Sequence, residues 1–283
     1  MAPILSFCYL NGDYSSGLAS NPLDSDITTL DHASNRLPAG AYTTFRTYQK
    51  YSALHLNDHI RRLEGSAGLA GYPIKLDTDQ LRRNLRAALS QFSGSDARVR
   101  LTLPFGLEPE TIYIHVDALS VPTAAQYDNG VKTITARMQR SNPAAKLSNF
   151  IQSSHQARQR LLEGFEEVLM VDDSENILEG LTSNFYAVMD GEIWTAGQEV
   201  LLGITRQMVL LLAHDAGFAV QLKAPKLSDL PRFTEAFITS TSRAVLPVTE
   251  IDFKPVGNGS PGSIAKKLMQ LYDQKIMAEI EPI

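Results

Sequence analysis

The segment that decides the fold is residues 165–195, FEEVLMVDDSENILEGLTSNFYAVMDGEIWT. Two apolar runs within it, Glu167–Val171 and Asn184–Met189, have the length and composition of buried strands. Asp190-Gly191 follows the second run directly, and this dipeptide suits a tight turn before a further strand at Glu192–Thr195. The segment therefore predicts consecutive strands joined by short connections, without the regular βαβ repeat of a doubly wound sheet.

Outward from this segment, strands and helices are interleaved in both halves of the chain. Further strands are predicted at Ile4–Leu10, Ala41–Tyr48, Ala97–Leu103, Thr111–Val116, Lys132–Met138 and Glu235–Thr239, and helices at Ser148–Leu162, after Asn57-Asp58, after Asp77-Thr78, after Thr205 and near the C-terminus. Residues 121–130 lose this periodicity and collect turn residues, which is typical of a linker. The pattern predicts an α+β protein with a small domain at 1–120, a linker at 121–130 and a larger domain at 131–283.

The composition indicates a globular protein with no strong charge bias. Of 283 residues, 43% are hydrophobic and 20% charged, and the formal net charge is −5, so extensive disorder is excluded and nucleic-acid or membrane-surface binding is disfavoured. One cysteine, Cys8, allows no internal disulfide, and neither cysteines nor histidines form a metal-binding motif. We expect a cytoplasmic protein without a metal or a membrane span.

Three dispersed elements are suited to binding an anion. Gly203, Ile204 and Thr205 lie where a helix begins, so free backbone N–H groups and the positive end of the helix dipole favour a phosphate there. The turn Ser240-Thr241-Ser242 supplies hydroxyl and amide donors, and Arg62 on a helix can hold a phosphate through two hydrogen bonds. Each feature alone is more typical of an ordinary helix start, turn or surface arginine.

Two further residues point to nucleophilic and acid–base chemistry. Lys146 follows a turn that contains proline, and a lysine desolvated in a cleft becomes a nucleophile able to form a Schiff base. Glu179 precedes the strand Asn184–Met189, where a carboxylate is either a loop charge or a buried partner for a cationic ring nitrogen. The residues alone predict a two-domain enzyme that binds phosphate, and they go no further.

Several strings follow one another along the chain: YLNG (9–12), GAYTTFRTY (40–48), LNDHIRRLEGSAGL (56–69), KLSN (146–149), residues 165–195, LLGITRQMVLLLA (201–213) and EAFITSTSRAVLPVTEID (235–252). Together and in this order they resemble the fold-type IV pyridoxal-phosphate enzymes, the class IV aminotransferases, most closely the D-amino acid branch. The resemblance covers nearly the whole chain, so it implies the family's two-domain α+β fold, pyridoxal 5′-phosphate as cofactor and a homodimer.

The resemblance also implies roles for individual residues. Lys146 would bind the cofactor and move a proton between the substrate and cofactor, and Glu179 would pair with the pyridine nitrogen. The cofactor would further contact Arg62, Leu201, Gly203, Ile204, Thr205, Ser240 and Thr241, of which Leu201 would pack on the ring and the others would surround the phosphate. Tyr42 would face the substrate, and Thr182 and Ser242 are further candidate substrate contacts.

The substrate anchor departs from the D-amino acid branch. That branch holds the substrate carboxylate with an Arg-x-His pair, whereas LPFGLEPE (103–110) contains neither residue. A carboxylate in a partly dry pocket still needs a cationic partner, for which arginine has the best geometry. The candidates are Arg100 first, then Arg36 and Arg98, with Arg46 and Arg243 as competitors.

The resulting functional hypothesis is an aminotransferase that exchanges an amino group between a D-amino acid and an α-keto acid. Asn149, three residues after Lys146, favours the D-amino acid and lyase branches over the branched-chain branch. An (R)-amine transaminase, an aminodeoxychorismate lyase and a branched-chain L-amino acid aminotransferase remain as alternatives.

Overall fold

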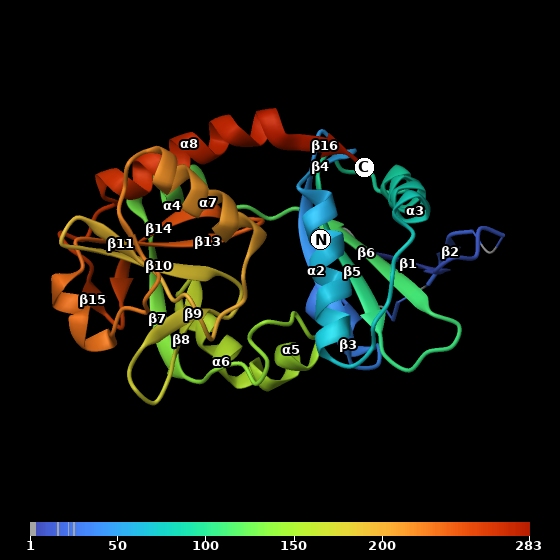
Figure 1. The fold of residues 1–283 in the computed structure, drawn as a ribbon, viewed down its shortest axis with the longest axis horizontal. Helices are drawn as coiled ribbons and strands as arrows, with labels where there is room; N and C mark the ends of the chain where they lie inside the picture. Colours follow the sequence, from blue (N-terminus) through green and yellow to red (C-terminus); the bar gives the residue numbers. More distant parts are fainter. Residues whose placement is uncertain (1–3, 16, 22, 25) are drawn as a thin grey trace. The chain divides into compact units, whose positions relative to one another are not determined.

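The computed structural model describes residues 4–15, 17–21, 23–24 and 26–283, which divide into two compact units (Figure 1). Unit 1 contains residues 1–120, 145–153 and 279–283, and unit 2 contains residues 121–144 and 154–278. The chain thus returns to unit 1 twice after first leaving it. The segment 145–153 belongs to unit 1 because Leu147 pairs with Ala41 of a strand there, and the C-terminal residues belong to it because they form an edge strand.

Unit 1 is built on one mixed-length antiparallel sheet. Its strands, in the order β16-β4-β3-β5-β6-β1-β2, are β16 (Ile280–Pro282), β4 (Ser52–Leu54), β3 (Gly40–Tyr48), β5 (Ala97–Pro104), β6 (Thr111–Ala118), β1 (Leu5–Leu10) and β2 (Ala19–Ser20). Because side chains alternate between the faces of a strand, the register separates an apolar face from a polar one.

The apolar face of this sheet carries Phe45, Val99 and Ile114 and forms the core of unit 1 with helices α2 (Leu56–Leu69) and α3 (Thr78–Ser90). The side chain of Asp77 caps the first turn of α3 by accepting a hydrogen bond from the Gln80 N–H. The polar face carries Tyr42, Thr44 and Arg46 of β3, as their alternation in the sequence predicts. The short helix α1 (Leu30–Asn35) contacts this polar face.

Unit 2 contains a sheet whose strands close on themselves. The order β10-β13-β14-β7-β8-β9 is completed by pairing of β9 with β10, and β11, β12 and β15 extend it. The bounds are β7 (Val131–Arg137), β8 (Glu167–Val171), β9 (Ile177–Gly180), β10 (Asn184–Met189), β11 (Glu192–Trp194), β12 (Val220–Gln221), β13 (Glu235–Ser240), β14 (Ala244–Ile251) and β15 (Lys254–Pro255). Helices α7 (Ile204–Asp215) and α8 (Ser263–Glu279) belong to the same unit.

Two segments differ from their sequence-based expectations. Residues 121–130, expected as a linker, contain the helix α4 (Ala124–Asn129), which Thr123 and Gln126 start with a reciprocal capping box. The helix expected at Ser148–Leu162 is divided into α5 (Asn149–Ser153), α6 (His155–Gln159) and a 3₁₀ helix at Arg160–Glu163. The break falls at Ser154, a fully buried residue whose hydroxyl accepts a hydrogen bond from Arg158 Nε.

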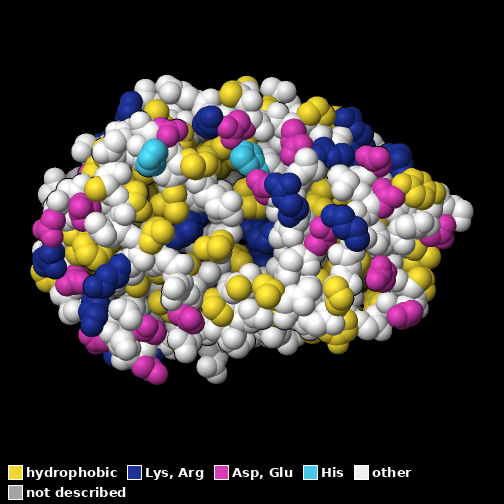
Figure 2. Space-filling model, in the orientation of Figure 1, with side chains coloured by type: hydrophobic (Ala, Val, Ile, Leu, Met, Phe, Trp, Pro, Cys, Tyr) yellow, Lys and Arg dark blue, Asp and Glu magenta, His cyan; other side chains and the backbone are white. Residues whose placement is uncertain are grey.

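The surface has no single-sign charge field on the face in view, where Lys and Arg side chains alternate with Asp and Glu (Figure 2). Within the described residues, no helix is long and apolar enough to cross a membrane. No group of His, Cys, Asp or Glu in that part of the chain is arranged to hold a metal ion.

Candidate active site

Lys146 is held at the edge of β3 in unit 1. Its backbone N–H donates to Ser66 Oγ of α2 at 3.0 Å, and its carbonyl accepts from the Tyr42 N–H at 3.0 Å. Its Nζ lies 4.8 Å from the centroid of the Tyr42 ring. The main chain of the lysine is therefore fixed by both a strand and a helix, while its amine remains over an aromatic ring of the polar face.

Arg62 is positioned by two buried neighbours. Its Nη2 donates to Thr43 Oγ1 at 2.9 Å, and the same hydroxyl lies 2.9 Å from Nδ1 of His59, which is three residues earlier on α2. Burial, followed by the positive charges of Arg62, Lys146 and His55, holds the pKa of His59 well below its usual range. His59 is therefore uncharged at neutral pH, so it orients Arg62 without adding to the positive charge.

Arg100, on β5, lies over the same ring as Lys146. Its Cζ is 4.7 Å from the centroid of the Tyr42 ring, and its Nε donates to Thr44 Oγ1 at 3.1 Å. Its Nη1 donates to the Leu30 carbonyl and to Ser34 Oγ, both at 2.9 Å, and forms an ion pair with Asp31 at 2.8 Å. Arg100 thus joins the polar face of the sheet to α1, and its side chain is only 7% exposed.

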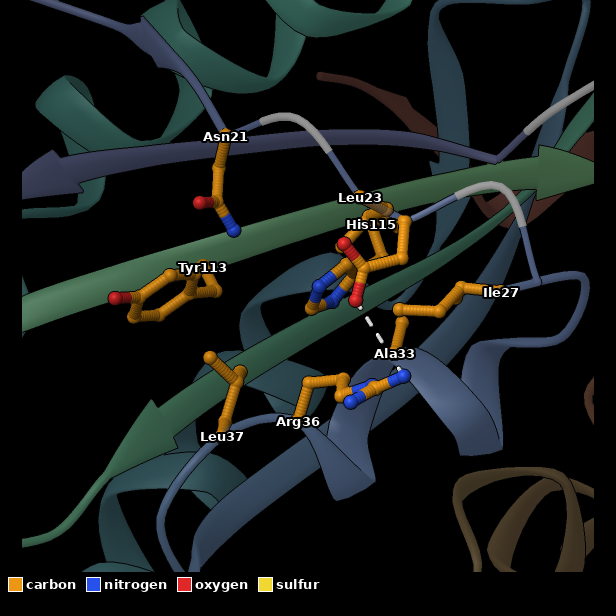
Figure 3. A pocket seen from close by; sticks show the side chains of 9 residues that line it. Asn21, Leu23, Ile27, Ala33, Arg36, Leu37, Tyr113 and His115 are labelled. Carbon is orange, nitrogen blue, oxygen red and sulfur yellow. Dashed lines mark ion pairs between the residues drawn. The ribbon is translucent and has the colours of Figure 1, made fainter.

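Two of the other candidate arginines of unit 1, Arg36 and Arg98, pair with carboxylates, and the third, Arg46, has its Cζ 4.5 Å from the centroid of the Tyr48 ring. Arg36 caps the end of α1, pairs with Asp24 at 3.4 Å and Asp26 at 3.2 Å, and lines a pocket of about 260 Å³ that also contains His115 (Figure 3). Arg98 lies 3.7 Å from Asp117. The structure places the guanidinium of Arg100 at the ring that Lys146 contacts.

Glu179 is fixed within unit 2 by donors from three sides. Its Oε1 accepts from Arg140 Nε at 2.6 Å, its Oε2 accepts from Asn184 Nδ2 at 3.1 Å, and the Leu201 N–H is 3.2 Å from both oxygens. The side chains of Arg140 and Glu179 are only 4% and 2% exposed. This carboxylate is therefore oriented inside the unit by its ion pair and hydrogen bonds, as an acceptor for a cationic N–H group requires.

A helix begins after Gly203, as the sequence predicts, and its start lies beside the Glu179 carboxylate. Gly203 is the N-cap of α7, and a Cβ placed on it would lie 2.3 Å from Asn184 Oδ1, so a larger residue would have to displace the Asn184 side chain. Asn184 connects the two features, because its Nδ2 donates to both Glu179 and the Leu201 carbonyl. Ile204 and Thr205 begin the helix, where the first N–H groups have no acceptor within the helix.

The turn at Ser240 closes β13 onto β14, and Ser240 Oγ accepts from the Arg243 N–H at 3.3 Å. Thr241 and Ser242 occupy the turn itself. Thr182 is already engaged: its hydroxyl is 2.5 Å from Oε2 of the buried Glu167 and 2.8 Å from Arg243 Nη1. Arg243 also pairs with Glu166 at 2.8 Å and with Glu167 at 3.4 Å.

The donor set of each unit fits one part of pyridoxal phosphate. Unit 2 offers the carboxylate of Glu179 for a ring nitrogen and helix-start amides for a phosphate, and Leu201 connects them. Unit 1 offers the amine of Lys146 and the guanidinium of Arg62. Sequence reasoning missed Arg140, Asn184 and His59. Only His59 carried a local signal, since it precedes Arg62 by three residues on one helix.

Comparison with known proteins identifies the family. Residues 40–251 match the amino-transferase class IV family. The chain is 29% identical over 279 residues to a putative branched-chain-amino-acid aminotransferase of Methanocaldococcus jannaschii, covering 93% of this chain and 94% of that protein. It is also 29% identical over 253 residues to the D-alanine aminotransferase of Bacillus licheniformis, covering 85% and 88%.

The fold agrees with this assignment. A branched-chain amino acid aminotransferase of T.th., solved with pyridoxamine 5′-phosphate, superposes with a TM-score of 0.80 at 22% identity and covers 98% of both chains. The resemblance inferred from the sequence strings, including the fold-type IV architecture, is confirmed. This chain belongs to the class IV aminotransferase family and is a pyridoxal-phosphate-dependent transaminase.

Proposed function

We propose that this transaminase exchanges the amino group of a D-configured α-amino acid with an α-keto acid. The observation that carries the choice of an α-amino acid is the shared ring of Tyr42, which has Lys146 Nζ at 4.8 Å and Arg100 Cζ at 4.7 Å. An amine and a guanidinium around one ring suit a substrate in which the reacting carbon bears a carboxylate. An amine substrate without a carboxylate would leave the guanidinium without a role in binding.

The residues of the site divide the work of the reaction. When bound, pyridoxal phosphate supplies an electron sink for negative charge at the substrate Cα. Lys146 would carry the amine that holds the cofactor and would later move the substrate proton. Glu179 would accept a hydrogen bond from the ring nitrogen, and for the phosphate unit 1 offers Arg62 while unit 2 offers the first amides of α7 and the turn at Thr241.

Arg100 has donor capacity left for a substrate. Its Nε and Nη1 are engaged by Thr44 and α1, whereas Nη2 donates to no other described residue. An α-carboxylate on Nη2 would pair with a guanidinium that packing on Tyr42 and α1 already holds in place. Binding would therefore cost little additional side-chain ordering.

The D configuration rests on the sequence, through the spacing of Lys146 and Asn149. The relatives do not decide the substrate. A D-alanine aminotransferase and a putative branched-chain-amino-acid aminotransferase are each 29% identical to this chain. The configuration is therefore the first property to measure.

The test measures half-reactions of the purified enzyme, followed by cofactor absorbance, with D-alanine, D-glutamate, L-leucine and (R)-1-phenylethylamine. The proposal expects turnover of a D-amino acid and little with L-leucine. Replacing Arg100 with Ala should weaken amino acid binding by about 2–5 kcal/mol, with much less effect on the amine. Arg98→Ala, which removes an arginine paired with Asp117, is the matched control.

Other outcomes select the alternatives. Preference for L-leucine would identify a branched-chain enzyme, and preference for the amine with no effect of Arg100→Ala would identify an (R)-amine transaminase. Loss of both activities to the same extent in Arg100→Ala would mean that Arg100 supports the fold rather than the substrate.

A further inference from the structure

Arg243 directly follows the turn at 240–242, which connects β13 with β14 in unit 2. Its Nε donates to Glu166 Oε1 at 2.8 Å, where β8 begins. Its Nη1 donates to Thr182 Oγ1 at 2.8 Å and lies 3.4 Å from Glu167 Oε2. The side chain of Arg243 therefore connects the end of the 240–242 turn to the start of β8 and to the turn that follows β9.

Glu167, the fully buried partner of Arg243, also accepts hydrogen bonds from the turn after β9. Its Oε2 accepts from the Thr182 hydroxyl at 2.5 Å and from the Ser183 hydroxyl at 3.0 Å. Asn184 follows directly, and its amide donates to Glu179. One carboxylate and one guanidinium therefore join the 240–242 turn to the segment that orients the proposed acceptor for the ring nitrogen.

The backbone that follows Arg243 has a conformation that its own sequence does not favour. Ala244 pairs with Ser240 where β14 begins, and its φ of 52° lies in the left-handed region that favours glycine. The Cβ of alanine makes this conformation unfavourable. Tyr127 of α4 donates to the Arg243 carbonyl at 2.9 Å. Contacts to both the side chain and the carbonyl of Arg243 therefore support a turn that local sequence alone would not hold.

We infer that Arg243, together with Glu167, is a positioning residue for the cofactor phosphate, because it fixes the turn that carries Thr241. This inference rests on the proposed function, in which Thr241 contributes to the phosphate site. The guanidinium itself is not assigned to the phosphate, since its Nε and Nη1 already donate to protein acceptors. Donors that are held in place bind an anion more tightly than mobile ones, because less conformational freedom is lost on binding. Arg243 therefore contributes to the affinity for the phosphate group and not to the affinity for the rest of the cofactor.

The experiment compares two ligands of the full-length apoenzyme that differ only in the phosphate ester, pyridoxal 5′-phosphate and pyridoxal. Absorbance titration gives both dissociation constants, and the Kd of pyridoxal divided by the Kd of pyridoxal phosphate measures the contribution of the phosphate. Arg243→Gln should lower this ratio at least about tenfold by weakening pyridoxal phosphate, and should change the Kd of pyridoxal less than about twofold. A merely structural role would weaken both ligands alike.

Two further variants separate positioning from stability and from charge. Arg243→Gln leaves the buried Glu167 without its cation, which destabilises unit 2. In Arg243→Gln/Glu167→Gln neither charge of this pair remains, and the ratio should still fall because Arg243 no longer holds the turn. Arg232→Gln is the matched control, because it also removes a guanidinium of unit 2 that pairs with two carboxylates, those of Asp190 and Asp229. It should leave the ratio unchanged.

Thr241→Val, which removes the hydroxyl proposed to bind the phosphate, distinguishes failure of this inference from failure of the phosphate site. If Thr241→Val lowers the ratio and neither Arg243 variant does, Arg243 is not a positioning residue and the phosphate site stands. If Thr241→Val and both Arg243 variants leave the ratio unchanged, the turn does not bind the phosphate and the two proposals fail together. Equal weakening of both ligands in the Arg243 variants, or the same fall of the ratio in Arg232→Gln, would assign the effect to stability or net charge and would also refute the inference.

Discussion

Replacing Arg140 with Gln tests whether the buried carboxylate of Glu179 depends on a compensating charge. The substitution removes the 2.6 Å hydrogen bond and ion pair from Arg140 Nε to Glu179 Oε1, and also the 3.4 Å contact from Nη2 to the Leu181 carbonyl. Both charged side chains are almost entirely buried, at 4% and 2% exposure. The variant therefore leaves a negative charge without its cation inside unit 2.

The expected cost is large because solvent cannot replace the lost partner. Breaking a buried ion pair by removing one member costs about 3–5 kcal/mol. Asn184 Nδ2 and the Leu201 N–H continue to donate to the carboxylate, so we expect a value near the lower limit, about 3 kcal/mol. Arg137→Gln is the control. The side chains of Arg137 and its partner Glu175 are 61% and 47% exposed, so loss of this ion pair should change the free energy of unfolding little.

Urea unfolding of the apoprotein, followed by fluorescence of the single tryptophan, Trp194, measures this free energy in unit 2. The double variant Arg140→Gln/Glu179→Gln should regain part of the loss, since no uncompensated charge remains. Bound pyridoxal phosphate should reduce the cost in Arg140→Gln, because the ring N–H supplies another donor to Glu179. A loss below about 1 kcal/mol, or a double variant no more stable than Arg140→Gln, would refute the reasoning.

Three further predictions concern the cofactor and pH. Lys146→Ala should abolish the lysine-bound cofactor absorbance and transamination, and a retained borohydride-reducible adduct would contradict this role. Glu179→Gln keeps the size but not the charge, so turnover should fall by roughly 10²–10⁴, measured with saturating cofactor; near wild-type rates would exclude the ring-nitrogen role. Partial burial lowers the pKa of His55, but hydrogen bonds to Glu279 and Asp58 outweigh it and the net shift is upward. The contribution of His55 to the free energy of unfolding should therefore be complete below its unfolded-state pKa of about 6.5. It should be lost as the pH rises through the higher pKa that His55 has in the folded protein. Calorimetric unfolding of His55→Gln should approach wild type at alkaline pH, and a difference independent of pH would contradict the linkage.

Local patterns in the sequence predicted much of the fold and the family. Alternation along residues 41–48 placed Tyr42 and Thr44 on one polar face, and Gly203-Ile204-Thr205 marked the start of α7, as the structure has them. These features depend on residues within one strand or one helical turn. Local sequence is sufficient for them because side-chain alternation and helix capping involve only neighbours along the chain.

Local patterns did not predict where a helix is interrupted or where a short helix forms. Helical spacing continues through 148–162, yet the helix is interrupted at the fully buried Ser154. Residues 124–129 form α4 although their composition is typical of a linker. Short helices depend mainly on caps and packing rather than on periodicity, since an isolated helix of this length is unstable.

The order of strands in the sheets determined the partners of the functional charges. Arg140 and Glu179 are 39 residues apart, and Arg100 reaches Leu30 and Ser34 across 70 and 66 residues. The sequence by itself determined the family and the residue types available for its chemistry. Only the tertiary structure decided that Arg140 compensates Glu179 and that Asp31 faces Arg100. The energy of a buried charge depends on which groups surround it in space, and strand pairing and loop closure bring those groups together from distant parts of the chain.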